Sequence, residues 1–276
     1  MQAKLTVNEK HWPVTHEGVS VIDFLYDVSG LSKNKIKQVM QKGAVWHSRG
    51  QQEKRIRRAN KQLEVGDTVH LYYDEKILNA IPPKPELIAD EVDYSIWCKP
   101  YGLFSQGSRW GDHCTINRWV EQNHLPQRPA FIVHRLDRAA SGLMIIAHSK
   151  KMAAAFSAMF REGQINKSYR AWVHGCFPET DKPVTYEDLI DGKMAISHVN
   201  RLEYDSHEDI SLLNVNIETG RKHQIRKHLS MHGFPIMGDR LYGNDTGDCD
   251  LKLTSYELSF ISPVDGSSKQ YCLDKL

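Results

Sequence analysis

The sequence predicts an α+β protein built from two domains. From Asp93 onward, segments with strand character alternate with helical segments, which is typical of a mixed α+β domain. Residues 18–74 form a separate pattern of two short helices, a basic loop and closing strands. The stretch between these patterns carries three prolines and reads as a linker. We therefore expect a first domain at 1–75, a linker at 76–90 and a second domain at 91–276.

The elements of the first domain follow from apolar spacing and capping residues. Apolar residues within 19–25 have helical spacing and predict the first helix. The second helix is expected to begin after Ser32, whose hydroxyl can cap its first turn, and to end at Gly43 as a C-cap. A strand at 44–47 precedes the basic loop, and an alternating strand at 68–73 follows it.

Basic residues are concentrated in one short window of this domain. Between Leu31 and Lys61 there are ten basic residues and one acidic residue, Glu53, although the whole chain has a formal net charge of only +2. Such a local excess indicates a surface that binds a polyanion, and a solvated basic loop is the alternative. The residues expected to form this patch are Lys33, Lys35, Lys37, Arg55, Arg57 and Arg58.

The second domain contains six apolar or alternating segments that predict strands. These segments are 94–98, 142–147, 169–173, 198–204, 211–218 and 254–260. A helix is expected at 152–161, because its apolar residues form a single stripe, and another at 223–231.

The remaining composition excludes several classes of protein. No apolar stretch approaches the ~20 residues of a membrane span, and the first residues lack a signal-peptide pattern. The five cysteines are scattered without a CxxC pair, so we expect reduced thiols in a cytoplasmic protein. No histidine pair has supported metal-ligand spacing, so no metal is expected. The lack of a further apolar surface pattern favours a monomer.

The most informative segment is His134-Arg135-Leu136-Asp137, which places a carboxylate just before a buried apolar run. Asp137 lies between Arg135 and Arg138, and nearby positive charge favours its ionised form. An ionised carboxylate at the edge of a core is what a nucleophile or a general base requires. The alternative is an aspartate that only caps a turn or pairs with an arginine.

The stretch HRLD-RA-ASGLMIIA resembles the catalytic motif of the RluA-type pseudouridine synthases, with one departure at Ala140, where the family usually carries threonine. Further segments that resemble the family follow in its order at 97–103, 167–171, 219–229 and 233–243. The resemblance therefore covers roughly residues 94–260.

The resemblance implies a mixed, largely antiparallel central sheet flanked by helices, and isomerisation of uridine to pseudouridine in RNA. This reaction needs no redox cofactor or metal, so none is expected. The resemblance assigns the catalytic role to Asp137, its cationic partner to Arg226 and the active-site tyrosine to Tyr169. An arginine can hold a carboxylate by two hydrogen bonds, and an aromatic ring can stack on uracil. Whether the carboxylate attacks the base, attacks the sugar or removes a proton stays open.

Each of these roles has an alternative. Arg226 could contact phosphate from a helix surface, and Tyr169 could be an ordinary strand tyrosine. A uridine in folded RNA must leave its stack to reach Asp137, and related enzymes fill the gap with the arginine that corresponds to Arg135. The residues expected to bind the flanking phosphates are His134, Arg221, Lys222, His223 and Lys227.

The first domain resembles the S4 RNA-binding module through SKNKIKQVMQKGAVW and LEVGDTVHLYY. Together the two resemblances imply an RNA pseudouridine synthase, with ribosomal RNA favoured over transfer RNA by analogy. An RNA-binding protein with an inert synthase domain is the first alternative, although this chain keeps Asp137 and Arg226. The second alternative is a metal-free ribonuclease that uses His134, His223 and His228.

Overall fold

The described residues of this protein form two compact units. The structure, a computed structural model, describes residues 7–243 and 249–274. The N-terminal unit contains the described residues up to Pro82 together with the segment Gln106–Trp119, and the C-terminal unit contains the remainder. Each unit has a hydrophobic core of its own. None of the helices in the described ranges is long and apolar enough to cross a membrane.

The division of the chain differs from the expected boundaries in two respects. The stretch 76–90 is not a simple linker, because it contains β5 (Glu86–Asp90) and all but the first residue of α3 (Glu75–Leu78). In addition, Gln106–Trp119 lies within the expected second domain but packs with the N-terminal unit. Composition could not show that this segment belongs to the N-terminal unit, because the segment is held there by contacts with residues far away in the sequence.

The N-terminal unit consists of a four-stranded antiparallel sheet covered by α1 (Val21–Ser29) and α2 (Lys33–Gln41). In spatial order its strands are β1 (Val7–Pro13), β4 (Thr68–Asp74), β2 (Val45–Arg49) and β3 (Gln52–Arg55). The apolar stripes of both helices are buried against β2 and β4, which explains the helical spacing seen in the sequence.

The ends of α2 follow the expected chemistry with one adjustment. Ser32 is the N-cap, and its hydroxyl accepts the backbone N–H of Lys35 at 3.3 Å. The C-cap residue is Lys42, and Gly43 follows it with a φ of +81° that favours glycine. Gly43 has a second reason to lack a side chain, because a Cβ there would overlap the carboxylate of Asp112.

The C-terminal unit is built on a large, mostly antiparallel sheet, as expected. The sheet order begins with β10 (Val184–Ile190), β11 (Lys193–Asp205), β12 (Ile210–Ile217) and β9 (Asn166–His174). It continues with β13 (Leu253–Ile261), β8 (Ser141–Ala147), β6 (Tyr94–Lys99) and β5. Two further strands, β14 (Ser268–Cys272) and β7 (Phe131–Ile132), pair with β13 and β8, respectively. In the part of the chain that is described, only β8 and β13 pair in parallel.

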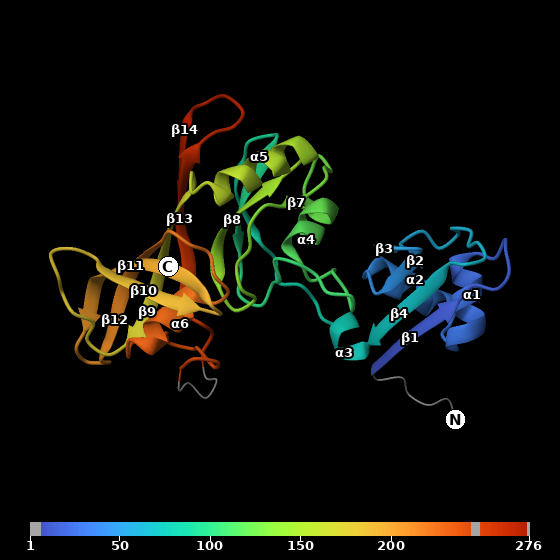
Figure 1. Cartoon of the computed structure of the whole chain (residues 1–276), viewed down its shortest axis with the longest axis horizontal. Helices are drawn as coiled ribbons and strands as arrows, with labels where there is room; N and C mark the ends of the chain where they lie inside the picture. Colours follow the sequence, from blue (N-terminus) through green and yellow to red (C-terminus); the bar gives the residue numbers. More distant parts are fainter. Residues whose placement is uncertain (1–6, 244–248, 275–276) are drawn as a thin grey trace. The chain divides into compact units, whose positions relative to one another are not determined.

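Two helices cover parts of this sheet, as Figure 1 shows. Helix α5 (Lys150–Arg161) packs on β7 and β8, and its buried residues join a core with residues of β6, β8 and β13. Helix α6 (Gln224–Met231) packs against β10 and β11. A further helix, α4 (Ile116–Asn123), contains the boundary between the two units. The turn that precedes β8, the strand β9 and the start of α6 carry the predicted catalytic residues.

Gly142, at the start of β8, lies where that turn joins the sheet, and the close packing there can be tested. Its φ is +110°, and a Cβ would overlap the backbone of Ser255 on β13. We expect Gly142→Ala to lower the free energy of unfolding by about 3 kcal/mol or more, from backbone strain and overpacking together. Gly163→Ala is the matched control, because φ is +70° there but nothing lies within 4 Å of the added Cβ. Urea denaturation measures both, and equal losses would contradict the steric explanation.

Candidate active site

One cavity in the C-terminal unit gathers nearly all the residues predicted to act on the substrate. It has a volume of about 550 Å³ and is bounded by the turn before β8, by β9, and by the start of α6 with the loop before it. Of the nine predicted catalytic and substrate-binding residues, all but Lys227 line it. Residues from three separate stretches of sequence therefore meet around one space.

The backbone around Asp137 is held on both sides. Before it, the buried Ser105 hydroxyl donates to the carbonyl oxygen of Leu136 at 2.6 Å and accepts the N–H of the same residue at 3.0 Å. After it, the N–H of Ala140 donates to the carbonyl oxygen of Asp137 at 3.2 Å. The carboxylate itself is 21% exposed at the cavity wall. Asp137 is thus a partly exposed charge on a fixed backbone.

Lys99 supports the same turn from the end of β6. It is fully buried, and its Nζ donates to the carbonyl oxygens of Leu103 at 2.9 Å and Ala140 at 2.6 Å. Burial lowers the pKa of Lys99 to about 8, against the opposing effect of the Asp137 charge. The sequence marked this lysine only as part of a motif, and nothing in its spacing indicated a contact with the turn.

Arg226 faces Asp137, but its hydrogen bonds go elsewhere. Its Nη1 lies 3.7 Å from Oδ2 of Asp137. Its Nε and Nη2 donate to Oδ2 and Oδ1 of Asp239 at 2.7 and 2.6 Å. The expected two-bond pairing of Arg226 is therefore made with Asp239 and not with Asp137. The reason is that Asp239 is completely buried directly beside the guanidinium, where an unpaired carboxylate would be costly.

His223 is the second group that faces Asp137. Its Nε2 lies 3.6 Å from Oδ1 of Asp137, and its Nδ1 is 2.9 Å from the hydroxyl of Tyr242. Its φ of +56° is uncommon for a residue other than glycine and aims the ring from the N-cap position of α6. Burial is the main cause of a lowered pKa of His223, and Asp137 opposes it. His223 was expected to bind a flanking phosphate, but the structure places its ring next to the carboxylate of Asp137.

Tyr169 lies on β9 with its ring at the cavity wall and its side chain buried. Burial raises the pKa of its phenol, and the charge of Asp137 raises it further, so the phenol is neutral. A neutral ring at this wall offers a flat surface to a planar ligand.

His134 has a different place from the one expected for a phosphate-binding cation. Its Nε2 accepts the backbone N–H of Ile145 at 2.9 Å, and its ring lies 4.5 Å from that of Phe160. Burial lowers the pKa of His134 to about 3. A ring nitrogen that accepts a hydrogen bond carries no proton, so His134 is a neutral supporting residue and the prediction of a cation is corrected.

The other predicted cations divide between the cavity and its surroundings. Arg135 is exposed and lines the cavity, as do Arg221 and Lys222. The Nε of Arg221 donates to the carbonyl oxygen of Met194 at 2.8 Å, which fixes the side chain. Lys227 instead pairs with Asp191 at 2.8 Å and does not line the cavity.

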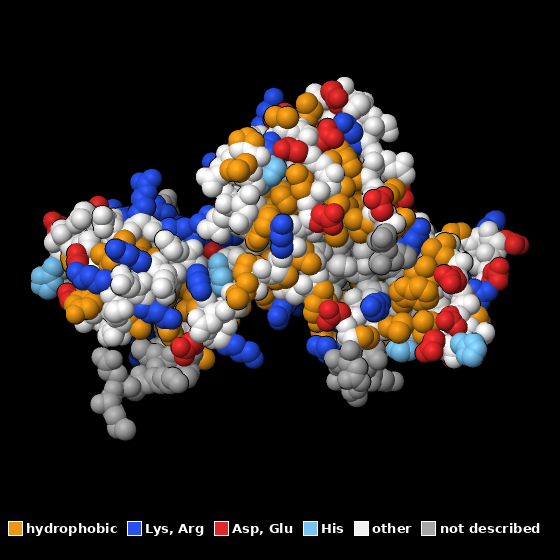
Figure 2. Space-filling model, turned by 180° about the vertical axis from the view of Figure 1, so that it is seen from behind, with side chains coloured by type: hydrophobic (Ala, Val, Ile, Leu, Met, Phe, Trp, Pro, Cys, Tyr) orange, Lys and Arg blue, Asp and Glu red, His pale blue; other side chains and the backbone are white. Residues whose placement is uncertain are grey.

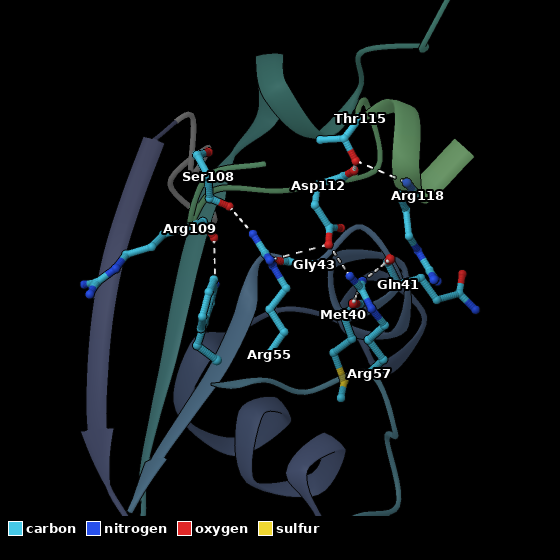
Figure 3. Close-up of polar contacts among 11 residues, drawn as sticks. Met40, Gln41, Gly43, Arg55, Arg57, Ser108, Arg109, Asp112, Thr115 and Arg118 are labelled. Atoms are coloured by element: carbon cyan, nitrogen blue, oxygen red, sulfur yellow. Dashed lines mark hydrogen bonds and ion pairs between the residues drawn. The ribbon is translucent and has the colours of Figure 1, made fainter. Parts of the chain in front are cut away.

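The basic patch of the N-terminal unit is smaller than its charge count suggested. Lys and Arg side chains are spread over the face of this unit that Figure 2 shows. Figure 3 shows, however, that Arg55 and Arg57 are engaged within the unit. Arg57 pairs with Asp112 and donates to the carbonyl oxygen of Gln41 at 2.7 Å. Arg55 lies 3.5 Å from the same carboxylate and donates to the carbonyl oxygen of Ser108.

Arg55 and Arg57 are therefore corrected from free surface cations to partners that hold Gln106–Trp119 in place. Lys33 is also paired, with Asp23 at 2.6 Å, although both groups are exposed. Lys37 and Arg58 are exposed to solvent. In the described ranges, no group of three or more His, Cys, Asp or Glu side chains could hold a metal ion.

Comparison with known proteins gives a consistent result. The family described as RNA pseudouridylate synthase matches residues 93–231. An uncharacterized RNA pseudouridine synthase of Aquifex aeolicus is 28% identical over 271 residues, which cover 85% of this chain and 83% of that protein. Ribosomal large subunit pseudouridine synthase D of Neisseria meningitidis is 32% identical over 224 residues, covering 70% of this chain but only 59% of that protein.

A solved structure supports the fold independently. Human RNA pseudouridylate synthase domain containing 1 superposes with a TM-score of 0.59 at 22% identity, over 71% of this chain and 86% of that protein. At this identity the likeness concerns the fold alone. The mixed sheet of the C-terminal unit is thus a known arrangement.

The neutral state of His134 predicts a pH dependence of stability. Its folded pKa is lowered from 6.5 to about 3, so the unfolded chain binds a proton first as the pH falls. This contribution is fully present above pH 6.5 and is lost between 6.5 and 3. In His134→Gln the amide oxygen can still accept the N–H of Ile145, but the side chain does not titrate. Between pH 7.5 and 5 we therefore expect the free energy of unfolding of this variant to fall by up to about 2 kcal/mol less than that of wild type. Urea denaturation at both pH values measures the free energy of unfolding. An equal loss in wild type and in His134→Gln would contradict a neutral histidine at this position.

Proposed function

Because this chain belongs to the RNA pseudouridylate synthase family, we propose that it isomerises uridine to pseudouridine in RNA with Asp137 as its catalytic carboxylate. One observation carries this proposal: Asp137 is a carboxylate without a tight partner at the wall of a cavity, with Arg226 and His223 both just beyond hydrogen-bonding distance. A carboxylate in this state is accessible and free to react.

The reaction requires few groups from the protein, and residues of the cavity can provide them. The N1–C1′ bond of uridine breaks, the detached base turns, and a C5–C1′ bond forms while C5 loses its hydrogen as a proton and N1 gains one. The product has the same composition as the substrate, so the protein must supply a charged group and hold a flat base. Tyr169 provides a neutral ring on which uracil can stack and turn.

Access to the cavity requires the uridine to leave its stack. Arg135 is exposed and adjacent to the cavity, so its planar guanidinium can fill the gap in folded RNA. Arg221 and Lys222 line the cavity and can hold the phosphates that flank the extruded nucleotide. These contacts orient the RNA but do not read its sequence.

We propose ribosomal RNA as the substrate and the cytoplasm as the place of action. The relative in Neisseria meningitidis is described as a ribosomal large subunit enzyme. The N-terminal unit, with two helices on a small antiparallel sheet and exposed cations, supports an S4-like RNA-binding role. The five cysteines are all free thiols, which fits a reducing compartment.

Asp137→Asn tests the reaction directly. The substitution keeps the size of the side chain and removes its charge, so we expect folded protein, retained RNA binding and no detectable turnover. RNA transcribed with tritium at uracil C5 is incubated with each protein, and released tritium is counted. Ribosomal and transfer RNA are supplied separately, and we expect release by wild type on ribosomal RNA. Release by Asp137→Asn would exclude Asp137 as the catalytic group, and release on transfer RNA alone would replace the proposed substrate.

The salt dependence of RNA binding tests the N-terminal patch. We expect the double variant Lys37→Gln, Arg58→Gln to bind more weakly and to reduce the slope of log K against log salt by about two, if each side chain contacts one phosphate. Lys151→Gln is the control, because Lys151 is exposed on α5 outside the patch. An unchanged slope in the double variant would remove these residues from the RNA-binding surface.

A further inference from the structure

Arg226 lies between two carboxylates but forms hydrogen bonds with only one of them. Its Nε and Nη2 bind the two oxygens of Asp239 at 2.7 and 2.6 Å, a geometry that directs the remaining Nη1 towards Asp137. The distance from Nη1 to Oδ2 of Asp137 is 3.7 Å, which is longer than a hydrogen bond. The guanidinium is therefore fixed to Asp239 by hydrogen bonds and forms only a longer ion pair with Asp137.

Asp239 is itself immobile. Its side chain is 0% exposed, and its Oδ1 accepts the backbone N–H groups of Leu241 at 3.0 Å and Tyr242 at 3.1 Å. Burial alone would raise its pKa, but the hydrogen bonds from Arg226 hold the pKa of Asp239 below its usual value. A charged carboxylate on a tight turn thus provides a fixed anchor for the guanidinium.

The same turn also supports the other neighbour of Asp137. The hydroxyl of Tyr242 lies 2.9 Å from Nδ1 of His223, and the Tyr242 ring lies 5.1 Å from the centre of the Arg226 guanidinium. One short segment, Asp239 to Tyr242, therefore sets the positions of both groups that face Asp137 from α6.

We propose that Asp239 is a positioning residue that keeps Arg226 close to Asp137 without letting it bind Asp137 tightly. This inference rests on the proposed function and adds a second aspartate to it. A guanidinium with two of its N–H groups committed elsewhere stabilises the charge of Asp137 and leaves the oxygens free. If Asp239 did not hold Arg226, the guanidinium would close on Asp137 through two hydrogen bonds and the carboxylate would be less available for reaction.

The charged and titratable groups that face Asp137 define what a pH profile would report. Arg226 and His223 face it from α6, Lys99 from the end of β6 and Tyr169 from β9. Of these four groups, Arg226 binds Asp239 directly, whereas His223 is connected to it only through Tyr242.

Asp239→Asn is the decisive variant. Its amide oxygen can still accept the N–H groups of Leu241 and Tyr242, but its NH₂ group opposes the Nε–H of Arg226, so one of the two bonds that hold the guanidinium is lost. We expect kcat for tritium release to fall about 10–100-fold with little change in KM, a loss of the size seen when residues that orient metal ligands are removed. We also expect the acid limb of the kcat profile to move to lower pH, because an unshared cation favours the charged carboxylate.

Asp67→Asn is the matched control, because Asp67 is equally buried and binds Nε and Nη2 of Arg49 at 2.6 and 2.9 Å in the N-terminal unit. It should lower stability without moving the acid limb. A folded Asp239→Asn protein with wild-type kcat and pH profile would overturn the proposal, as would an equal displacement of the acid limb in Asp67→Asn.

Asp239→Glu decides the question if Asp239→Asn does not fold. It keeps the charge but moves the carboxylate, so we expect an unchanged acid limb and a several-fold lower kcat. Wild-type kcat in this variant would show that the position of Arg226 does not matter. Absence of tritium release by the wild-type protein would instead contradict the proposed function and, with it, this inference.

Discussion

A single buried guanidinium lies between two carboxylates, and the arrangement of the cavity depends on how it is shared. Arg226 is 5% exposed, Asp239 is 0% exposed and Asp137 is 21% exposed. Charges removed from water are tolerated only when they are paired, and the most buried carboxylate takes the two good hydrogen bonds. The carboxylate left with incomplete pairing is therefore the one at the cavity wall. The same electrostatic constraint therefore leaves Asp239 fully paired and Asp137 incompletely paired.

Such an arrangement is useful only if Asp137 cannot drift towards its cationic neighbour. The turn that carries it is bonded through Ser105 on one side and through Lys99 and Ala140 on the other. The lysine is fully buried, so its hydrogen bonds to carbonyl oxygens are formed in a medium of low polarity, where they are strong. The carboxylate of Asp137 thus projects from a backbone that is fixed by groups outside the cavity, which is how sites gain precise geometry.

The sequence predicted what depends on local pattern and missed what depends on distant pairing. All six strands predicted for the C-terminal unit are present, and each has neighbours on both sides in the sheet. Six strands were not predicted, and each of them pairs with only one neighbour, so its half-exposed side chains show little alternation: β1, β3, β5, β7, β10 and β14. In the site, motifs located Asp137 and Arg226, but spacing could not show that Asp239 competes for the same guanidinium. His134 was misread for a similar reason, because its partner is a backbone N–H.

The basic patch of the N-terminal unit was overestimated for the same reason, because ion pairs with residues far away in the sequence could not be predicted. A count of charges along the chain registers neighbours in sequence, whereas Asp112 reaches Arg55 and Arg57 from more than fifty residues away. Two of the predicted phosphate contacts are therefore satisfied inside the protein, and what remains is a set of exposed cations. On the proposed function, such cations supply affinity for any RNA backbone, since phosphate contacts carry no sequence information. The choice of uridine must then depend on the shape of the RNA and on the cavity that receives the extruded base, where Arg135 and Tyr169 lie.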